Sequence, residues 1–88
     1  MKRVEMAEAM RLVIRDYCNK AGITQAWLAR RVNIHEKKLS AFMSGARTER
    51  VKLFDLLKIL HHFRVTLAEF ERDVLAKHQQ FRAFMGDV

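Results

Sequence analysis

The histidines and the single cysteine are the side chains best suited to bind a metal or attack a substrate, and their spacing favours neither chemistry. His35, His61, His62 and His78 include no pair four residues apart, the separation that brings two imidazoles together on one helix face. Cys18 has no second cysteine with which to form a disulfide or a Cys-x-x-Cys site. The sequence also lacks a glycine-rich phosphate loop and a nucleophile elbow. We therefore expect no metal, no cofactor, no small-molecule substrate and no enzymatic activity.

The basic residues offer a different chemistry, the binding of a polyanion. The chain carries 17 basic and 10 acidic residues, a net charge of +7. Residues 22–52 hold seven of the basic residues and two of the acidic ones, whereas residues 53–88 are balanced. A basic excess confined to one segment suits a surface that displaces counterions from nucleic acid. The alternative from charge alone is a solvated basic face without a partner.

The length and composition describe the scaffold that must hold these cations. Eighty-eight residues with half of them apolar suffice for one small core, so we expect a single domain spanning residues 1–88. The chain has no proline and three glycines, which favours a few helices with short connections. The lone cysteine indicates a reducing compartment. No apolar stretch approaches the roughly 18 residues of a membrane span, and the charged amino end leaves no room for a signal peptide. The expected location is therefore cytoplasmic.

The apolar periodicity of the first 33 residues predicts two helices. Apolar side chains recur every three or four residues from Val4 to Ala21, and Gly22 should end this helix in the left-handed conformation. Thr24 is a good N-cap for a second, shorter helix that runs to about Val32. Asn33 should end it, because asparagine also tolerates the left-handed region.

The remaining sequence predicts three further helices. A third covers Glu36 to Ser44, with Gly45 as its stop, and turns Leu39, Phe42 and Met43 inward. A fourth should run from about residue 51 to 63. A fifth should follow the capping box formed by Thr66 and Glu69 and continue to about residue 85. The apolar residues that we expect the fourth helix to bury are Val51, Leu53, Phe54, Leu56, Leu57, Ile59, Leu60 and Phe63.

The segment from Gly22 to Gly45 resembles the helix-turn-helix of the Cro and phage-repressor family of transcriptional regulators. The resemblance extends over roughly residues 10–70 and implies an all-α, five-helix fold like the lambda-repressor DNA-binding domain, here with an extended carboxyl-terminal helix. Its helix-turn-helix would span about residues 24–44. Ala29 suits the close approach of two helices that cross within a short turn. The residues that carry the resemblance are Thr24-Gln25, Leu28-Ala29, Asn33-Ile34, Leu39, Gly45 and Val65-Thr66-Leu67-Ala68-Glu69-Phe70.

The family resemblance also implies a set of DNA-contacting residues on and around the third helix. Residues at its amino end and on its outer face would meet base edges in the major groove of double-stranded DNA. A lysine there can donate to guanine, a glutamate can accept from cytosine, and an alanine can contact the methyl group of thymine. The base-facing residues would be Glu36, Lys37, Ala41 and Ser44. The phosphate-contacting residues would be Gln25, Lys38, Arg47, Arg50 and Lys52.

Several positions depart from the family pattern. His35 stands where a serine or threonine N-cap is usual, so we expect the third helix to be weakly capped. Asn33 replaces the commoner glycine at the turn. Met43 stands where many members have a glutamate, and the loop after Gly45 is about two residues longer than usual. Trp27 occupies a position that generally faces solvent; we expect it to pack, with contact to DNA backbone or to a partner as alternatives.

The carboxyl-terminal helix, at about residues 67–85, suggests how the protein assembles. Val74, Phe81, Phe84 and Met85 extend an apolar stripe past the point where the family domain usually closes. Exposed apolar patches often mark interfaces, so we expect a homodimer joined partly through this helix. The alternative is a helix folded onto its own core.

The sequence thus favours a sequence-specific DNA-binding transcriptional regulator, most simply a dimeric repressor. The alternative is an antitoxin-type interaction module that binds a partner protein and regulates its own promoter.

Overall fold

The computed structural model of the chain describes residues 3–44 and 53–84, and within these residues it contains helices and no strands. The expected all-α, five-helix fold is confirmed, with each helix starting and ending within about two residues of the predicted position. The five helices are α1 (Arg3–Ala21), α2 (Gln25–Arg31), α3 (Glu36–Ser44), α4 (Leu53–His62) and α5 (Leu67–Phe84).

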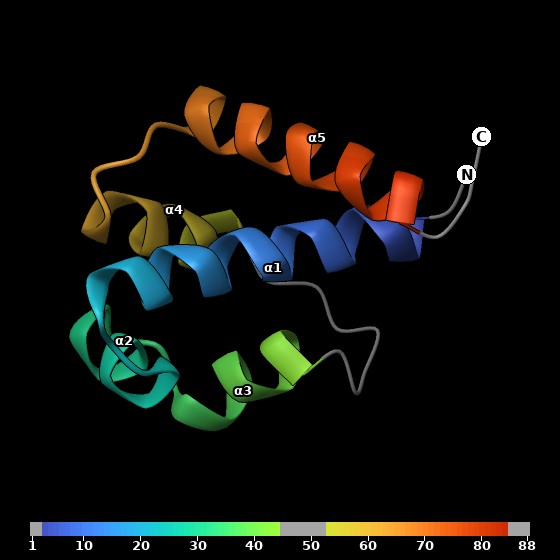
Figure 1. Cartoon of the computed structure of the whole chain (residues 1–88). Helices are drawn as coiled ribbons and strands as arrows, with labels where there is room; N and C mark the ends of the chain where they lie inside the picture. Colours follow the sequence, from blue (N-terminus) through green and yellow to red (C-terminus); the bar gives the residue numbers. More distant parts are fainter. Residues whose placement is uncertain (1–2, 45–52, 85–88) are drawn as a thin grey trace.

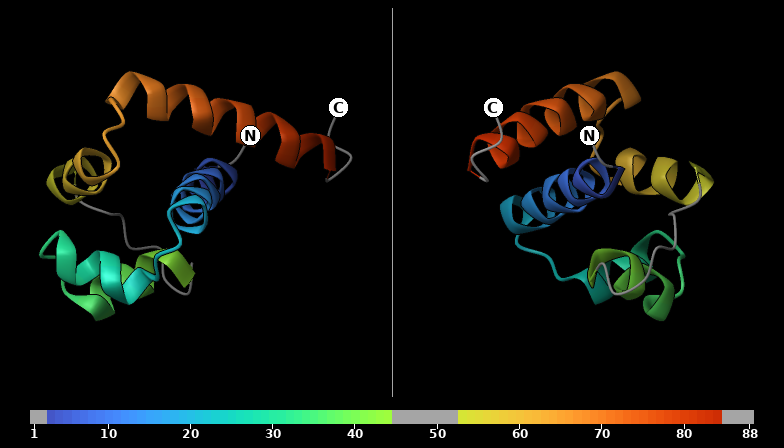
Figure 2. Two further views of the ribbon diagram at one scale, coloured as in Figure 1. Left: turned by 60° about the vertical axis from the view of Figure 1, so that its left-hand side comes forward. Right: turned by 90° about the vertical axis from the view of Figure 1, so that its right-hand side faces the viewer.

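The longest helix, α1, runs through the middle of the molecule (Figure 1). Helix α5 packs on one side of α1 and runs in roughly the opposite direction. Helices α2 and α3 contact each other and lie on the other side, so that α3 and α5 occupy opposite edges in every view (Figure 2). The edge that carries α3 is therefore open to solvent.

Among the described residues, three helices end with a residue in the left-handed conformation, whereas Gly45, the expected stop of α3, lies outside them. Gly22 (φ 69°) and Asn33 (φ 60°) end α1 and α2 as predicted. Arg64 (φ 57°) does the same after α4, and nothing in the sequence marked this arginine for that role. In each case the following residue donates its N–H to a carbonyl five positions earlier, which satisfies an otherwise unpaired helix end. These bonds join Ile23 to Cys18 (3.0 Å), Ile34 to Ala29 (2.8 Å) and Val65 to Leu60 (3.0 Å).

The helix starts also follow the predicted capping chemistry. The Thr24 hydroxyl accepts a hydrogen bond from the backbone N–H of Trp27 at 3.1 Å. Thr66 and Glu69 form the expected capping box, in which each side chain accepts from the backbone N–H of the other, at 3.1 Å and 2.8 Å. The hydrogen bond that the Thr66 backbone N–H donates to the Glu69 carboxylate lowers the pKa of that carboxyl.

The core joins all five helices. Its most completely buried large side chains are Ile14, Leu28, Ile59 and Leu60. The corner between α2 and α3 is closed as expected, because Leu28, Ala29, Ile34 and Leu39 are all buried. Cys18 is also buried, and this burial raises the pKa of its thiol.

The prediction for the fourth helix was wrong on one face. Leu53, Phe54 and Leu57 are 63%, 69% and 41% exposed, although we expected them to be buried. Asp55, by contrast, is 7% exposed. Apolar side chains project from nearly all sides of this helix, but the described part of the protein buries only those on the side that carries Leu56, Ile59 and Leu60. Val51 lies outside the described residues.

Polar contacts fasten α5 to α1. The Tyr17 hydroxyl donates a hydrogen bond to the Asp73 carboxylate at 2.5 Å, and the Tyr17 ring lies against Phe63 and Phe70. Asp16 forms an ion pair with Lys77 at 2.8 Å. Within the described ranges, no helix is both long enough and apolar enough to cross a membrane.

Candidate nucleic-acid interface

No helix among the described residues covers the outer face of α3. Its inner side chains, Leu39, Phe42 and Met43, are buried in the core. Glu36 and Lys37 are exposed, and α3 itself lies at the lower edge of the molecule (Figure 1). A helix held in this way can enter a groove about 12 Å wide, such as the major groove of B-form DNA.

The first turn of α3 is capped by a histidine. The His35 Nδ1 atom accepts a hydrogen bond from the backbone N–H of Lys37 at 3.2 Å. An N-cap serine or threonine makes the same kind of contact with its hydroxyl oxygen. The imidazole thus supplies an acceptor in the same place, and the expectation that this cap is weak stays a prediction.

Glu36 has a partner within the protein. Its carboxylate lies 3.6 Å from the guanidinium of Arg30 on α2, and both side chains are largely exposed. An exposed ion pair of this length contributes little to stability, roughly 0–1 kcal/mol. Glu36 therefore remains accessible to a ligand that approaches α3.

Lys38 is more firmly engaged than Glu36. Its Nζ atom forms an ion pair with Asp55 of α4 at 3.1 Å, and the Asp55 side chain is 11% exposed. Lys58 approaches the other Asp55 oxygen at 3.8 Å and donates a hydrogen bond to the Asn33 carbonyl at 3.2 Å. These contacts tie α3 and the turn before it to α4. The phosphate contact that we expected from Lys38 would compete with its bond to Asp55.

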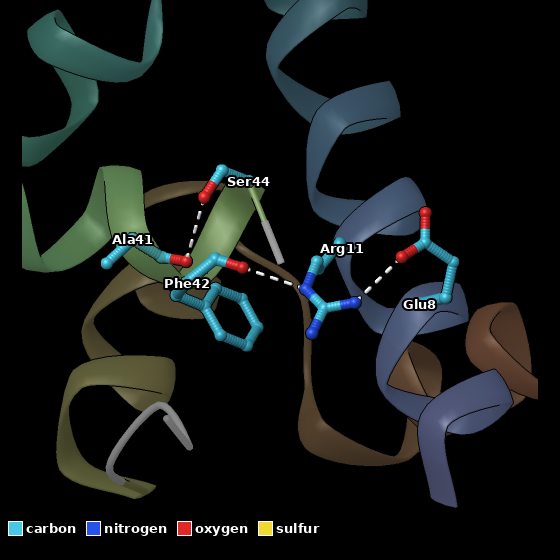
Figure 3. A network of polar contacts seen from close by, with 5 residues as sticks. All are labelled: Glu8, Arg11, Ala41, Phe42 and Ser44. Carbon is cyan, nitrogen blue, oxygen red and sulfur yellow. Dashed lines mark hydrogen bonds and ion pairs between the residues drawn. The ribbon is translucent and has the colours of Figure 1, made fainter. Parts of the chain in front are cut away.

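The far end of α3 is held by Arg11 of α1, a residue that our sequence reasoning missed. Its Nε atom donates a hydrogen bond to the Phe42 carbonyl at 2.8 Å, and its guanidinium lies over the Phe42 ring at 5.7 Å (Figure 3). Glu8 accepts a second hydrogen bond from Arg11 at 2.7 Å. The carbonyls of the last helical turn have no partner within the helix, so Arg11 completes this end. The sequence signal that could have indicated this role is the position of Arg11 beside the apolar stripe of the first helix.

The other predicted base-facing residues lie further along α3. Ala41 is partly exposed and Ser44 is exposed. The Ser44 hydroxyl donates a hydrogen bond to the Ala41 carbonyl at 3.2 Å, which turns it back toward its own helix (Figure 3). Gln25, a predicted phosphate contact, is the first residue of α2 and is partly exposed. The remaining predicted phosphate contacts, Arg47, Arg50 and Lys52, lie outside the described residues.

The predicted interface on the carboxyl-terminal helix needs one correction. Val74 is 5% exposed and belongs to the core, so it has almost no surface to offer to a second molecule. The cause is its place on the side of α5 that packs against α1 together with Phe70. Met85 and the side chains of Phe81 and Phe84 lie outside the described part of the chain.

Trp27 packs against the protein on one side, as expected, and is exposed on the other. Its ring packs against His62 at the end of α4, with 5.6 Å between the ring centroids, yet 42% of the residue remains exposed. His62 in turn packs edge-on against Phe63 at 5.0 Å. Trp27 thus covers the end of α4 and still presents part of its ring to solvent.

Comparison with known proteins agrees with this geometry. A family model described as a helix-turn-helix domain matches residues 9–72 of the chain. Neither the curated proteins nor the solved structures provide a match. The family match covers well over half of the chain, from within α1 to within α5, and the chain belongs to this helix-turn-helix family.

Proposed function

We propose that this helix-turn-helix domain is a sequence-specific, double-stranded DNA-binding transcriptional regulator, most simply a dimeric repressor. The observation that carries the proposal is the position of α3, which lies at an open edge with Glu36 and Lys37 exposed on its first turn. Fixed contacts from α1 and α4 hold the two ends of this helix. A rigid, projecting helix of this kind can be inserted into the major groove as a unit.

Each residue on the outer face of α3 has a distinct role in this proposal. Lys37 donates to the O6 and N7 atoms of guanine, and Glu36 accepts from the N4 amine of cytosine after leaving Arg30. Ala41 contacts the methyl group of a thymine, and Ser44 lies near the next bases along the groove. These contacts would supply the sequence preference of the protein.

Phosphate contacts would fix the register of the domain without reading sequence. We assign them to Gln25 at the start of α2 and to the segment that contains Arg47, Arg50 and Lys52. Lys38 takes a lesser part than the sequence suggested, because Asp55 already neutralises much of its charge.

A dimer would place two copies of α3 in successive major grooves, about 34 Å apart on a palindromic site. With Val74 assigned to the core, the proposed contact rests on Phe81, Phe84 and Met85. Sedimentation of a variant with Phe84→Ser and Met85→Ser tests it, and a variant that sediments like the unaltered protein would remove this end of the chain from the interface. Capture of a partner protein by these residues, with an unchanged dimer, would favour the antitoxin-type alternative.

Selection of bound sequences from a random duplex library, at about 150 mM salt, tests the proposal directly. We expect an enriched motif with two half-sites about one helical turn apart. Lys37→Ala should then cost about 1–3 kcal/mol on the selected site and much less on random duplex. Arg47→Ala should weaken both duplexes alike and reduce the dependence of binding on salt. If no motif is enriched, or if both variants lose affinity equally on both duplexes, the assigned roles are wrong.

A further inference from the structure

The exposed face of α4 is unusually apolar for a surface helix. Phe54 and Leu57 are 69% and 41% exposed, and they lie three residues apart on one side of the helix. Trp27, on neighbouring α2, exposes 42% of its surface. Single exposed apolar residues are common, but several on adjoining helices mark a binding surface.

Ring contacts and shared hollows join Trp27 to Phe54 along one strip. The Trp27 ring packs against His62, and Arg31 borders the same hollow as Trp27. Arg31 also lines a second, open hollow of about 410 Å³ between α2 and α4, with His62 and Lys58 on its other side. The Lys58 ammonium lies 4.9 Å from the centre of the Phe54 ring. We define the α2–α4 strip by Trp27, Arg31, Phe54, Leu57, Lys58 and His62.

The charge along this strip has one sign. Arg31 and Lys58 are cationic, and α2 contains no acidic residue at all. The one acidic residue of α4, Asp55, is buried and paired with Lys38 and Lys58. Arg31 has no ion pair of 4 Å or less among the described residues, unlike its neighbour Arg30, which pairs with Glu36 at 3.6 Å. The strip therefore combines exposed apolar rings with cations and presents no exposed carboxylate.

We propose that the α2–α4 strip binds an acidic amphipathic segment of a partner protein. The apolar side chains of the segment would lie on Phe54, Leu57 and Trp27. Its carboxylates would pair with Arg31 and, in competition with Asp55 and the Asn33 carbonyl, with Lys58. An amphipathic helix laid between two helices is a common mode of peptide recognition. Because the strip lies on α2 and α4, it leaves the outer residues of α3 uncovered, and the proposal does not depend on the assigned DNA contacts.

Two other occupants fit the strip less well. A second copy in a symmetric contact would bring the Arg31 and Lys58 cations of two strips into one interface, and like charges at close range oppose association. A DNA backbone would pair with the two cations but would leave Phe54 and Leu57 in water. An acidic, partly apolar partner satisfies both components.

Fluorescence anisotropy with a labelled synthetic peptide tests the proposal. The probe is a helix-forming peptide with leucine and phenylalanine along one face and glutamate on both flanks, and its counterpart carries lysine in place of every glutamate. We expect the acidic peptide alone to bind. Phe54→Ser and Arg31→Glu should each weaken it about tenfold or more, because aromatic anchors and arginine dominate such contacts. Both residues are exposed, and circular dichroism checks that the variants fold.

Matched controls and rival outcomes sharpen this test. Leu75→Ser on α5 is the control for Phe54→Ser, and Arg15→Glu on α1 is the control for Arg31→Glu. Both alter exposed residues away from the strip and should leave peptide binding unchanged. The proposal is overturned if the two peptides bind equally or if neither binds. It is also overturned if the strip variants bind the acidic peptide like the unaltered protein. Loss of random-duplex binding with no peptide binding would assign the strip to DNA, and loss of self-association would assign it to a second copy.

Discussion

The contact between Arg11 and the end of α3 makes a quantitative prediction. Replacing Arg11 with methionine keeps most of the aliphatic volume but removes the donor to the Phe42 carbonyl and the cation over the Phe42 ring. A hydrogen bond from a charged group is worth about 1.5–3 kcal/mol. A cation–π contact at a partly exposed site adds about 0.5–1 kcal/mol. We therefore expect Arg11→Met to lower the free energy of unfolding by about 2–4 kcal/mol.

The assay for Arg11→Met is thermal and urea denaturation followed by circular dichroism. For a domain of this size the loss corresponds to a fall in melting temperature of roughly 10 °C or more. Glu8→Gln is the matched control: it removes only the ion pair of Arg11 with a side chain that is 40% exposed, and should cost about 1 kcal/mol at most. If Arg11→Met melts within about 2 °C of the unaltered protein, Arg11 does not anchor α3 and our reasoning fails.

Three further predictions concern contacts around α3 and α1. Lys38→Ala should lower the free energy of unfolding by about 1–3 kcal/mol, because it removes the closer of the two cations that pair with buried Asp55. Lys37 is exposed, and Lys37→Ala should change the free energy of unfolding by about 0.5 kcal/mol or less. Urea titrations that fail to separate the two lysines would contradict this. His35→Ala should cost about 1 kcal/mol by removing the cap, and His35→Asn should restore most of it; equal losses would refute the cap. Burial and the hydrogen bond to a carboxylate raise the pKa of Tyr17 above its usual value, so the folded chain keeps the phenolic proton after the unfolded chain has lost it. Stability should therefore fall as pH rises past about 10, and Tyr17→Phe should remove that part of the fall in alkaline denaturation curves.

The helix boundaries were predictable because local chemistry determines them. Gly22 and Asn33 take the left-handed conformation for reasons that lie within a single residue, and the capping box of Thr66 and Glu69 needs only three residues of separation. The inner face of α3 followed from apolar periodicity for the same reason, whereas the stripe from Val4 to Ala21 missed Ala9 and Val13, which are buried on α1. Sequence reading succeeded where the deciding interaction lies within one or two turns of a helix.

The tertiary environment of α4 was not predictable in this way. A helix that is apolar on most sides gives no periodic signal for which side will be covered, and so Phe54 and Leu57 were misplaced. Asp55 is buried because Lys38, from another helix, neutralises it together with Lys58. Likewise, the carbonyl that Arg11 meets lies 31 residues away in the chain. Each of these contacts depends on how separate helices are brought together, which no local pattern records.

The pairing of Lys38 with Asp55 has a practical consequence for anyone wishing to retarget the domain. Glu36, Lys37 and Ala41 can be randomised in a combinatorial library at little cost, because none of these side chains is buried and the ion pair of Glu36 is exposed. Position 38 is different: most replacements would strip a buried carboxylate of its nearer counter-charge. Under the proposed function, variants chosen for new DNA sites should therefore diversify positions 36, 37 and 41 and retain lysine at position 38. Libraries that vary all four alike would lose many clones to misfolding before any could be screened for recognition.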